Sequence, residues 1–258
     1  FARAALATDI ELFEAFPVHY EAAAARQHRW ARGDWQLLPW LFGRGHTGSD
    51  PHRAVVIPVI GRWKILDNLR RTLSAPAAFL TLIVGWMLPE QSVWVWSGFI
   101  LTTMAIPSLL SFVLGLYPRR PGVALRTHFR GLGNDLKLAA RQIALTVIFL
   151  AHQAWLMTDA IVRTLGRLVF THRLMLEWVT ADQAEHAYTC SLTGMYRRMA
   201  GGVALAVVAA GGVALFGSYE SWVAVAPFVL LWLSAPAVAR WVSLPPRLTG
   251  VDPISPAD

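Results

Sequence analysis

The chain has 258 residues, of which 55% are hydrophobic and only 15% are charged, and its formal net charge is +7. A soluble domain usually carries about 25% charged residues, so the composition excludes an ordinary soluble domain and indicates a membrane protein. The single cysteine, Cys190, excludes an internal disulfide framework.

The positive charges are distributed as in a membrane protein rather than as on a nucleic-acid-binding surface. No Lys or Arg lies between Arg71 and Arg119 or between Arg198 and Arg240, and the basic residues cluster outside these two gaps. Each gap is long enough for a pair of membrane spans, because one span needs about 20 residues. The positive-inside rule predicts that the basic clusters are cytoplasmic. We therefore expect the lipid bilayer as a partner, and no nucleic acid.

Residues 1–55 have the scattered charge of a water-soluble unit, and the chain does not begin with Met. We expect this segment to be the C-terminal part of a longer domain. Residues 44–55 are predicted to form a polar loop. Its residues His46, Asp50 and His52 could hold a metal, but their spacing matches no regular ligand pattern. A flexible gating loop is therefore the favoured interpretation.

Residues 56–242 are predicted to form a membrane domain. Its first helix, 61–72, is basic and amphipathic, which is typical of a helix that lies on the membrane surface. Tryptophans near the segment ends are predicted to be interface anchors. The expected spans are about 73–88, 93–117, 201–217 and 221–239, and the expected anchors are Trp94, Trp96, Trp222, Trp232 and Trp241.

Residues 142–162 are ambiguous, because they lack Lys and Arg although both flanks are basic. A single span here would place one basic cluster outside, and would bury Asp159 in lipid at a cost of about 2–3 kcal/mol. We predict an interfacial or re-entrant helix, with a true span as the alternative. Asp159 lies four residues before Arg163, which predicts a structural ion pair.

The remaining segments are predicted to lie outside the membrane. Residues 163–198 are expected to form cytoplasmic helices. Thr180 followed by Gln183 predicts a capping box and a helix start near Ala181. Residues 243–258 are rich in Pro and polar residues, so they are expected to be a linker.

Residues 25–35, with the sequence ARQHRWARGDW, are the strongest functional motif. On a helix, Arg26 and Trp30 share a face. An Arg can neutralise the negative charge that grows on a departing diphosphate, and an aromatic ring can hold the apolar face of a sugar. The structural alternative is a basic, aromatic helix on a membrane surface. Asp34 is either a further site residue or a structural residue. In the second case it pairs with Arg32 or caps the turn at Gly33.

The pair Arg29-Trp30 resembles the Gln-x-x-Arg-Trp motif of processive family-2-type glycosyltransferases, such as cellulose and hyaluronan synthases. The string FARAALATDIELFEAFPVHYEAAAARQHRWARGDWQLLPWL resembles the glycosyltransferase module of cyclic β-1,2-glucan synthases. The strings RWKILDNLRRTLSAPA, FLAHQAWLMTDAIVRTL and LMLEWVTADQAE resemble their membrane region. One position departs from the motif, because Arg26 stands where Gln is expected.

The resemblance implies a mainly α fold: a polytopic α-helical membrane domain preceded by the C-terminal remnant of a GT-A type α/β glycosyltransferase domain. It also implies a bacterial inner-membrane enzyme that polymerises glucose from UDP-glucose into β-1,2-glucan at the cytoplasmic face. Arg29 would lie near the donor diphosphate and Trp30 would stack on the acceptor. Arg26, Asp34 and Trp35 would shape the site, and the growing glucan would be a partner. His152 and Gln153 would be either a buried polar pair or part of a glucan path.

The resemblance further implies that several parts lie outside this chain. The donor site, the general base and the ligands of a divalent metal, Mg²⁺ or Mn²⁺, are expected upstream, and a phosphorylase-like domain is expected downstream. We therefore expect no catalytic residue and no metal ligand in this chain, and no activity from it alone. The alternatives are a non-enzymatic polytopic membrane module for transport or scaffolding, and a synthase of a different β-glucan.

Overall fold

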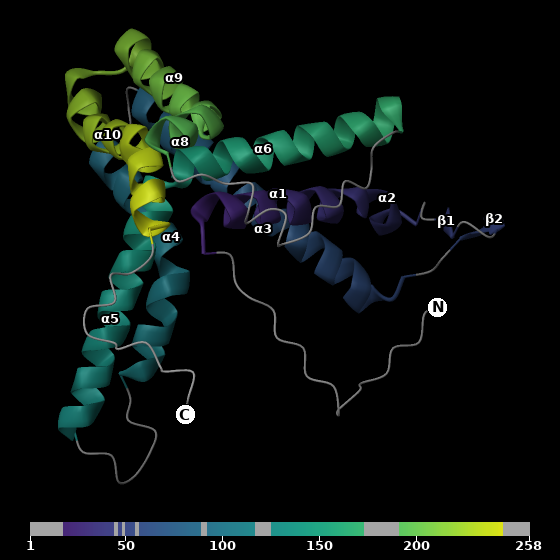
Figure 1. Cartoon of the computed structure of the whole chain (residues 1–258), viewed down its shortest axis with the longest axis horizontal. Helices are drawn as coiled ribbons and strands as arrows, with labels where there is room; N and C mark the ends of the chain where they lie inside the picture. The colour runs from purple at the N-terminus through teal and green to yellow at the C-terminus, as the bar shows by residue number, and fades with distance from the viewer. Residues whose placement is uncertain are drawn as a thin grey trace, which may run out of the picture.

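The computed structural model describes residues 18–43, 46–47, 50–54, 57–88, 92–116, 125–172 and 191–244, and only the backbone of 46–54 (Figure 1). This part of the chain is mainly α-helical, as the sequence predicts. The helices are α1 Tyr20–Gln36, α2 Leu38–Leu41, α3 Val59–Met87, α4 Val93–Gly115, α5 Leu125–Ile148, α6 Leu150–Gly166, α8 Leu192–Arg198, α9 Ala200–Phe216 and α10 Tyr219–Val242. A π-helical turn, η1 Arg167–Thr171, follows α6, and β1 His46–Thr47 pairs with β2 Asp50–Ala54.

Serine side chains fix the starts of three helices. The hydroxyl of Ser92 accepts from the Val95 N–H at the start of α4, and that of Ser191 accepts from the Gly194 N–H at the start of α8. Ser218 and Ser221 form a reciprocal capping box at the start of α10. Each contact satisfies backbone donors that have no partner within the helix itself.

The largest apolar core lies where α3, α4, α6, α9 and α10 meet. Trp86 of α3 and Trp232 of α10 are both buried there, with ring centroids 5.9 Å apart. The Trp86 indole N–H donates to the Ser97 hydroxyl at 2.8 Å, which satisfies a polar atom that burial would otherwise leave unpaired. Gly85 lies directly against the Trp96 ring, which leaves no room for a Cβ.

The helices extend from this core in two directions. α1 packs against α6 and α3, and in Figure 1 α1 and α6 run side by side to one side of the bundle. α4 and α5 pack against each other and extend together in another direction. The C-terminal end of α1 therefore lies away from α9 and α10.

By length and apolar composition, two described helices could cross a membrane: α4 and α10. They coincide with the expected spans 93–117 and 221–239. Two bent pairs would raise the number to four if each is one span: Arg126–Ile148 with Leu150–Thr171, and Leu192–Arg198 with Ala200–Phe216. The second pair contains the expected span 201–217.

The predicted division between a surface helix, 61–72, and a span, 73–88, is wrong, because α3 is one continuous helix. Pro76 lacks an N–H, which removes one backbone hydrogen bond. The preceding turn is held by side chains, since Thr72 donates to the Leu69 carbonyl and Ser74 donates to the Arg70 carbonyl. In addition, α3 is not one of the described helices that are long and apolar enough to cross a membrane.

The helix predicted over 142–162 is interrupted, because the chain bends by 61° at Phe149. Phe149 leaves the helical region, with φ −89° and ψ 1°, and its buried ring stacks on Tyr20 at 4.1 Å. A bend of this kind is found in a broken span or in a re-entrant loop, and the second of these is what the sequence predicts. Half of the predicted helical region 163–198, namely 173–190 with the capping box, lies outside the described residues.

Two smaller predictions need correction. The expected loop at 44–55 contains two antiparallel strands, which pair His46 with Ala54 and Thr47 with Asp50. Trp232 is not an interface anchor, because only 1% of it is exposed and its N–H donates to the Val147 carbonyl. The two strands form the only sheet among the described residues, so a GT-A remnant in 1–55 stays a prediction.

Candidate functional site

The motif residues 25–35 lie in α1, whose apolar face is made of small side chains. Ala24 and Ala31 are buried on one side of α1, and Ala31 packs against Met157 and Ala160 of α6, so the α1 backbone can approach α6 closely. The run Ala22–Ala25 also favours a helix, because Ala has the highest intrinsic helix propensity. The motif is therefore carried on a docked helix and not on a loop.

A polar chain joins the middle of α1 to α6. His28 Nε2 lies 2.9 Å from Asp159 Oδ2, and Asp159 also accepts from Arg163 Nε at 2.7 Å. The Asp159–Arg163 pair confirms the prediction made from their spacing. Burial lowers the pKa of His28 below its ordinary value, although the hydrogen bond to Asp159 acts in the opposite direction. His28 is therefore held mainly in its neutral form at pH 7.

The C-terminal end of α1 is fastened to α3. Asn68 donates to Asp34 Oδ1 at 3.0 Å, and the Trp35 indole N–H donates to the Thr72 hydroxyl at 2.9 Å. Burial raises the pKa of the Asp34 carboxyl, while the hydrogen bond from Asn68 lowers it. Through these contacts Asp34 and Trp35 position α1 on α3. A role in shaping the site, as the sequence predicts, would be additional to this structural role.

The N-terminal end of α1 is held by residues that the motif analysis does not single out. The Tyr20 N–H donates to the Ser243 hydroxyl at 2.9 Å, just beyond the end of α10. Glu21 is buried and pairs with Arg198 of α8. These partners are separated by 223 and 177 residues, so no local sequence pattern could have identified them.

The solvent-facing side of α1 presents one exposed aromatic ring, that of Trp30. Gln27, Trp30, Gly33 and Leu37 are exposed at helical spacing, and 62% of Trp30 is accessible. The Arg26 guanidinium lies 4.9 Å from the Trp30 ring centroid, which confirms that the two residues share a face. Arg29 is half-buried beside them. A Cβ at Gly33 would meet no atom within 4 Å, so the surface next to Trp30 is open.

This arrangement suits stacking on a sugar ring next to positive charge. An exposed indole offers a flat apolar face, and Arg26 restrains that ring through a cation–π contact. The motif has Gln where this chain has Arg26. Arg26 contacts Trp30 through its guanidinium and does not need the hydrogen bond that a Gln would make. Arg26 and Trp30 are brought together at one surface, whereas Asp34 and Trp35 lie at the α1–α3 junction.

No group of three His, Cys, Asp or Glu side chains that could hold a metal occurs among the described residues. The side chains of His46, Asp50 and His52 are outside that part, so a metal or a gating role for them stays a prediction. His152 is buried on α6, and Gln153 donates to the Tyr20 hydroxyl at 3.2 Å. His152 Nδ1 is buried without a hydrogen-bond partner, so the choice between a buried polar pair and a glucan path stays open.

The comparisons with known proteins agree with the resemblance noted in the sequence. No protein-family profile matches the chain. The chain is 40% identical over 244 residues to the protein named cyclic beta-(1,2)-glucan synthase NdvB of Rhizobium meliloti (strain 1021). The match covers 94% of this chain but only 8% of the length of that relative. The chain is therefore homologous to one region of a cyclic β-(1,2)-glucan synthase.

Proposed function

We propose that this chain is the acceptor-side region of a membrane-bound processive glycosyltransferase that builds β-1,2-glucan from UDP-glucose. The observation that carries the proposal is the exposed Trp30 with the Arg26 guanidinium over its ring and Arg29 beside it. The homology to a cyclic β-(1,2)-glucan synthase supports the choice of product.

In this proposal one side of α1 is held by neighbouring helices, and the other side is exposed to bind the sugar. Trp30 stacks on the terminal glucose of the growing chain, and Arg29 stabilises the charge that develops on the departing UDP. The contacts to α3, α6, α8 and α10 hold α1 in place. A stacking surface must be fixed in position, since an error of about 1 Å can cost 10²-fold in rate.

The other participants are proposed to lie elsewhere in the same polypeptide. They are the donor site, the general base, the ligands of a divalent metal and a phosphorylase-like domain. The proposed location is the bacterial inner membrane, with α1 at the cytoplasmic face next to the basic clusters. The lipid bilayer and the growing glucan are the proposed partners.

The test uses the natural polypeptide that contains this region, in membranes. Trp30→Ala and Arg29→Ala should abolish the formation of labelled glucan from UDP-glucose while the protein level in the membrane stays unchanged. Trp63→Ala is a matched control, because Trp63 of α3 is 63% exposed, almost the same as Trp30. Normal product from Trp30→Ala, or equal losses in both tryptophan variants, would contradict the proposal.

The same experiment separates the alternatives. A non-enzymatic transport or scaffold module would give no UDP-glucose-dependent polymer in the wild type. A synthase of a different β-glucan would give a polymer that depends on Trp30 but has another linkage. Linkage analysis of the wild-type product distinguishes this outcome from β-1,2-glucan.

A further inference from the structure

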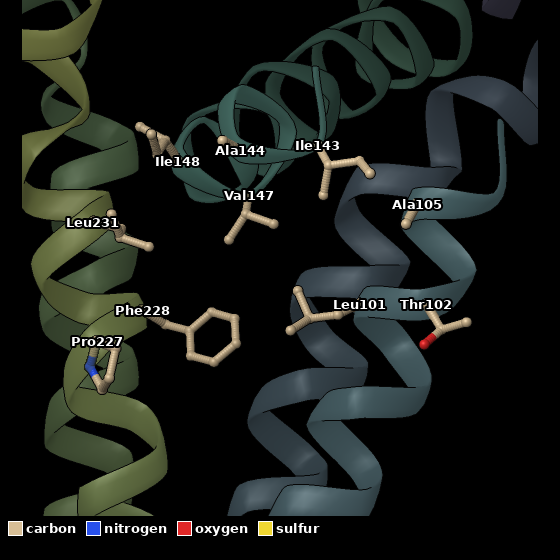
Figure 2. Close-up of a pocket in the computed structure, with 10 residues that line it drawn as sticks. All are labelled: Leu101, Thr102, Ala105, Ile143, Ala144, Val147, Ile148, Pro227, Phe228 and Leu231. Carbon is tan, nitrogen blue, oxygen red and sulfur yellow. The ribbon is translucent and has the colours of Figure 1, made fainter. Parts of the chain in front are cut away.

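An apolar pocket of about 470 Å³ lies where α4, α5 and α10 meet (Figure 2). Leu101 of α4, Val147 of α5 and Phe228 of α10 project into it from three sides. Thr102 carries the only polar side chain in the lining, and its hydroxyl donates to the Gly98 carbonyl at 2.7 Å. The pocket therefore presents no side-chain polar group in need of a partner, and it suits a hydrocarbon ligand.

The walls of the pocket are held in place by neighbouring contacts. Trp232 donates to the Val147 carbonyl at 3.0 Å, which ties α5 to α10 beside the pocket. The Phe228 ring lies 5.1 Å from Trp86 and 5.9 Å from Trp232, measured between ring centroids. The pocket is of the size of common small-molecule sites, about 300–1,000 Å³. It lies between α4 and α10, which are both long and apolar enough to cross a membrane, so lipid acyl chains would surround it.

A line of basic residues leads along α5 to this pocket. Arg126, Arg130, Lys137 and Arg141 are all exposed. At 3.6 residues per turn these positions fall within about 60° on the helix surface. Lys137 lies seven residues before the pocket residue Ala144, which is two turns on the same side of the helix and about 10 Å along its axis. A positively charged side chain therefore lies a short distance from the apolar pocket along α5.

We propose that this pocket holds an acyl chain of an anionic phospholipid whose phosphate contacts Lys137 and Arg141. The apolar lining matches the tail, and the two cations match the net negative charge of the headgroup. A zwitterionic phospholipid has the same tail but no net charge, so it should bind more weakly. Each basic residue near a membrane surface should favour the anionic lipid about fivefold. The site is separate from the α1 surface and does not depend on its function.

The test places the natural polypeptide in phosphatidylcholine vesicles that contain a trace of phosphatidylglycerol with a photoactivatable group at the end of one acyl chain. A phosphatidylcholine probe with the same tail is used in parallel. Cross-linked peptides are then mapped by mass spectrometry. The phosphatidylglycerol probe should label the α4 and α5 peptides that line the pocket, at least fivefold more strongly than the phosphatidylcholine probe. Equal labelling by the two probes would overturn the proposal.

Two pairs of substitutions locate the headgroup. Lys137→Gln with Arg141→Gln should bring the preference for the anionic probe close to one. Arg126→Gln with Arg130→Gln is the matched control, because these residues lie on the same face but farther from the pocket, and it should keep the preference. An equal effect of the two pairs would show an unspecific charged face and would overturn the site. All four positions are exposed, so these variants should fold.

Two further arms address the tail and the source of the phosphate. Ala144→Trp fills the pocket and should reduce labelling by both probes, whereas unchanged labelling would overturn the pocket as the tail site. Inorganic phosphate, added at the same ionic strength as a chloride control, should leave labelling unchanged. If phosphate alone removes the preference, the cations form a general anion site and the proposal is wrong.

Discussion

Gly202 of α9 offers a sharp test of how α9 packs on α6. A Cβ at this position would lie 2.7 Å from His152 Cα and 2.9 Å from His152 Cβ. Contacts this short involve the backbone of α6, so the neighbour cannot move aside by changing a rotamer. Gly202→Ala should therefore force the two helices apart. Gly211→Ala on the same helix is the matched control, because a Cβ there would meet no atom within 4 Å.

The expected size of the effect follows from two opposing terms. Overpacking a closely packed contact costs about 1–3 kcal/mol. Replacing Gly by Ala inside a helix recovers up to about 1 kcal/mol of helix propensity. Gly202→Ala should then lower the free energy of unfolding by up to about 2 kcal/mol, and it should be about 1–3 kcal/mol less stable than Gly211→Ala. Gly211→Ala has only the favourable term and should be neutral or slightly stabilising.

The measurement is thermal unfolding of the purified chain in detergent micelles, followed by far-UV circular dichroism. For a chain of this size, 1 kcal/mol corresponds to a change of about 2–4 °C in Tm. Gly202→Ala should melt several degrees below Gly211→Ala. If the two variants melt at the same temperature, or Gly202→Ala melts higher, α9 does not pack on α6 as described and the reasoning fails.

Two further predictions concern the docking of α1. Because the pKa of His28 is lowered in the folded protein, the unfolded state binds more protons just below the ordinary value of 6.5. The free energy of unfolding should be at its full value above pH 6.5 and should fall as the pH drops from there toward the lowered pKa. His28→Gln should flatten this part of a plot of Tm against pH. An equal slope in the variant would show that another group titrates. Trp35→Phe keeps an aromatic ring, although a smaller one, and removes the hydrogen bond to Thr72, so it should cost at least about 0.5–1.5 kcal/mol in the same unfolding assay. Trp63→Phe, at an exposed position, should leave Tm unchanged, and a similar loss in both variants would contradict the α1–α3 contact.

Contacts within one helix could be predicted from the sequence. The pairs Arg26–Trp30 and Asp159–Arg163 are both four residues apart, and both meet in the structure. The helix repeat alone places such residues on one face. The apolar helices α4 and α10 were also predictable, since their suitability to cross a membrane depends on length and composition.

Contacts between helices could not be predicted in this way. Asp34 meets Asn68 and Trp35 meets Thr72 because α1 docks on α3, and neither partner stands out in the sequence. Trp232 has the composition signal of an interface anchor, yet it lies in the core. A tryptophan suits both environments, because its ring is apolar and its N–H needs only one acceptor.

Composition and local sequence were enough to predict a helical membrane chain, its relation to glucan synthases and the contact between Arg26 and Trp30. These depend on composition and on neighbours a few residues apart. Only the tertiary structure decided that the chain bends at Phe149, that α1 is fastened at both ends and that Trp30 remains exposed. These features depend on which helix faces pack together, and that is settled by shape and hydrogen bonding between distant segments.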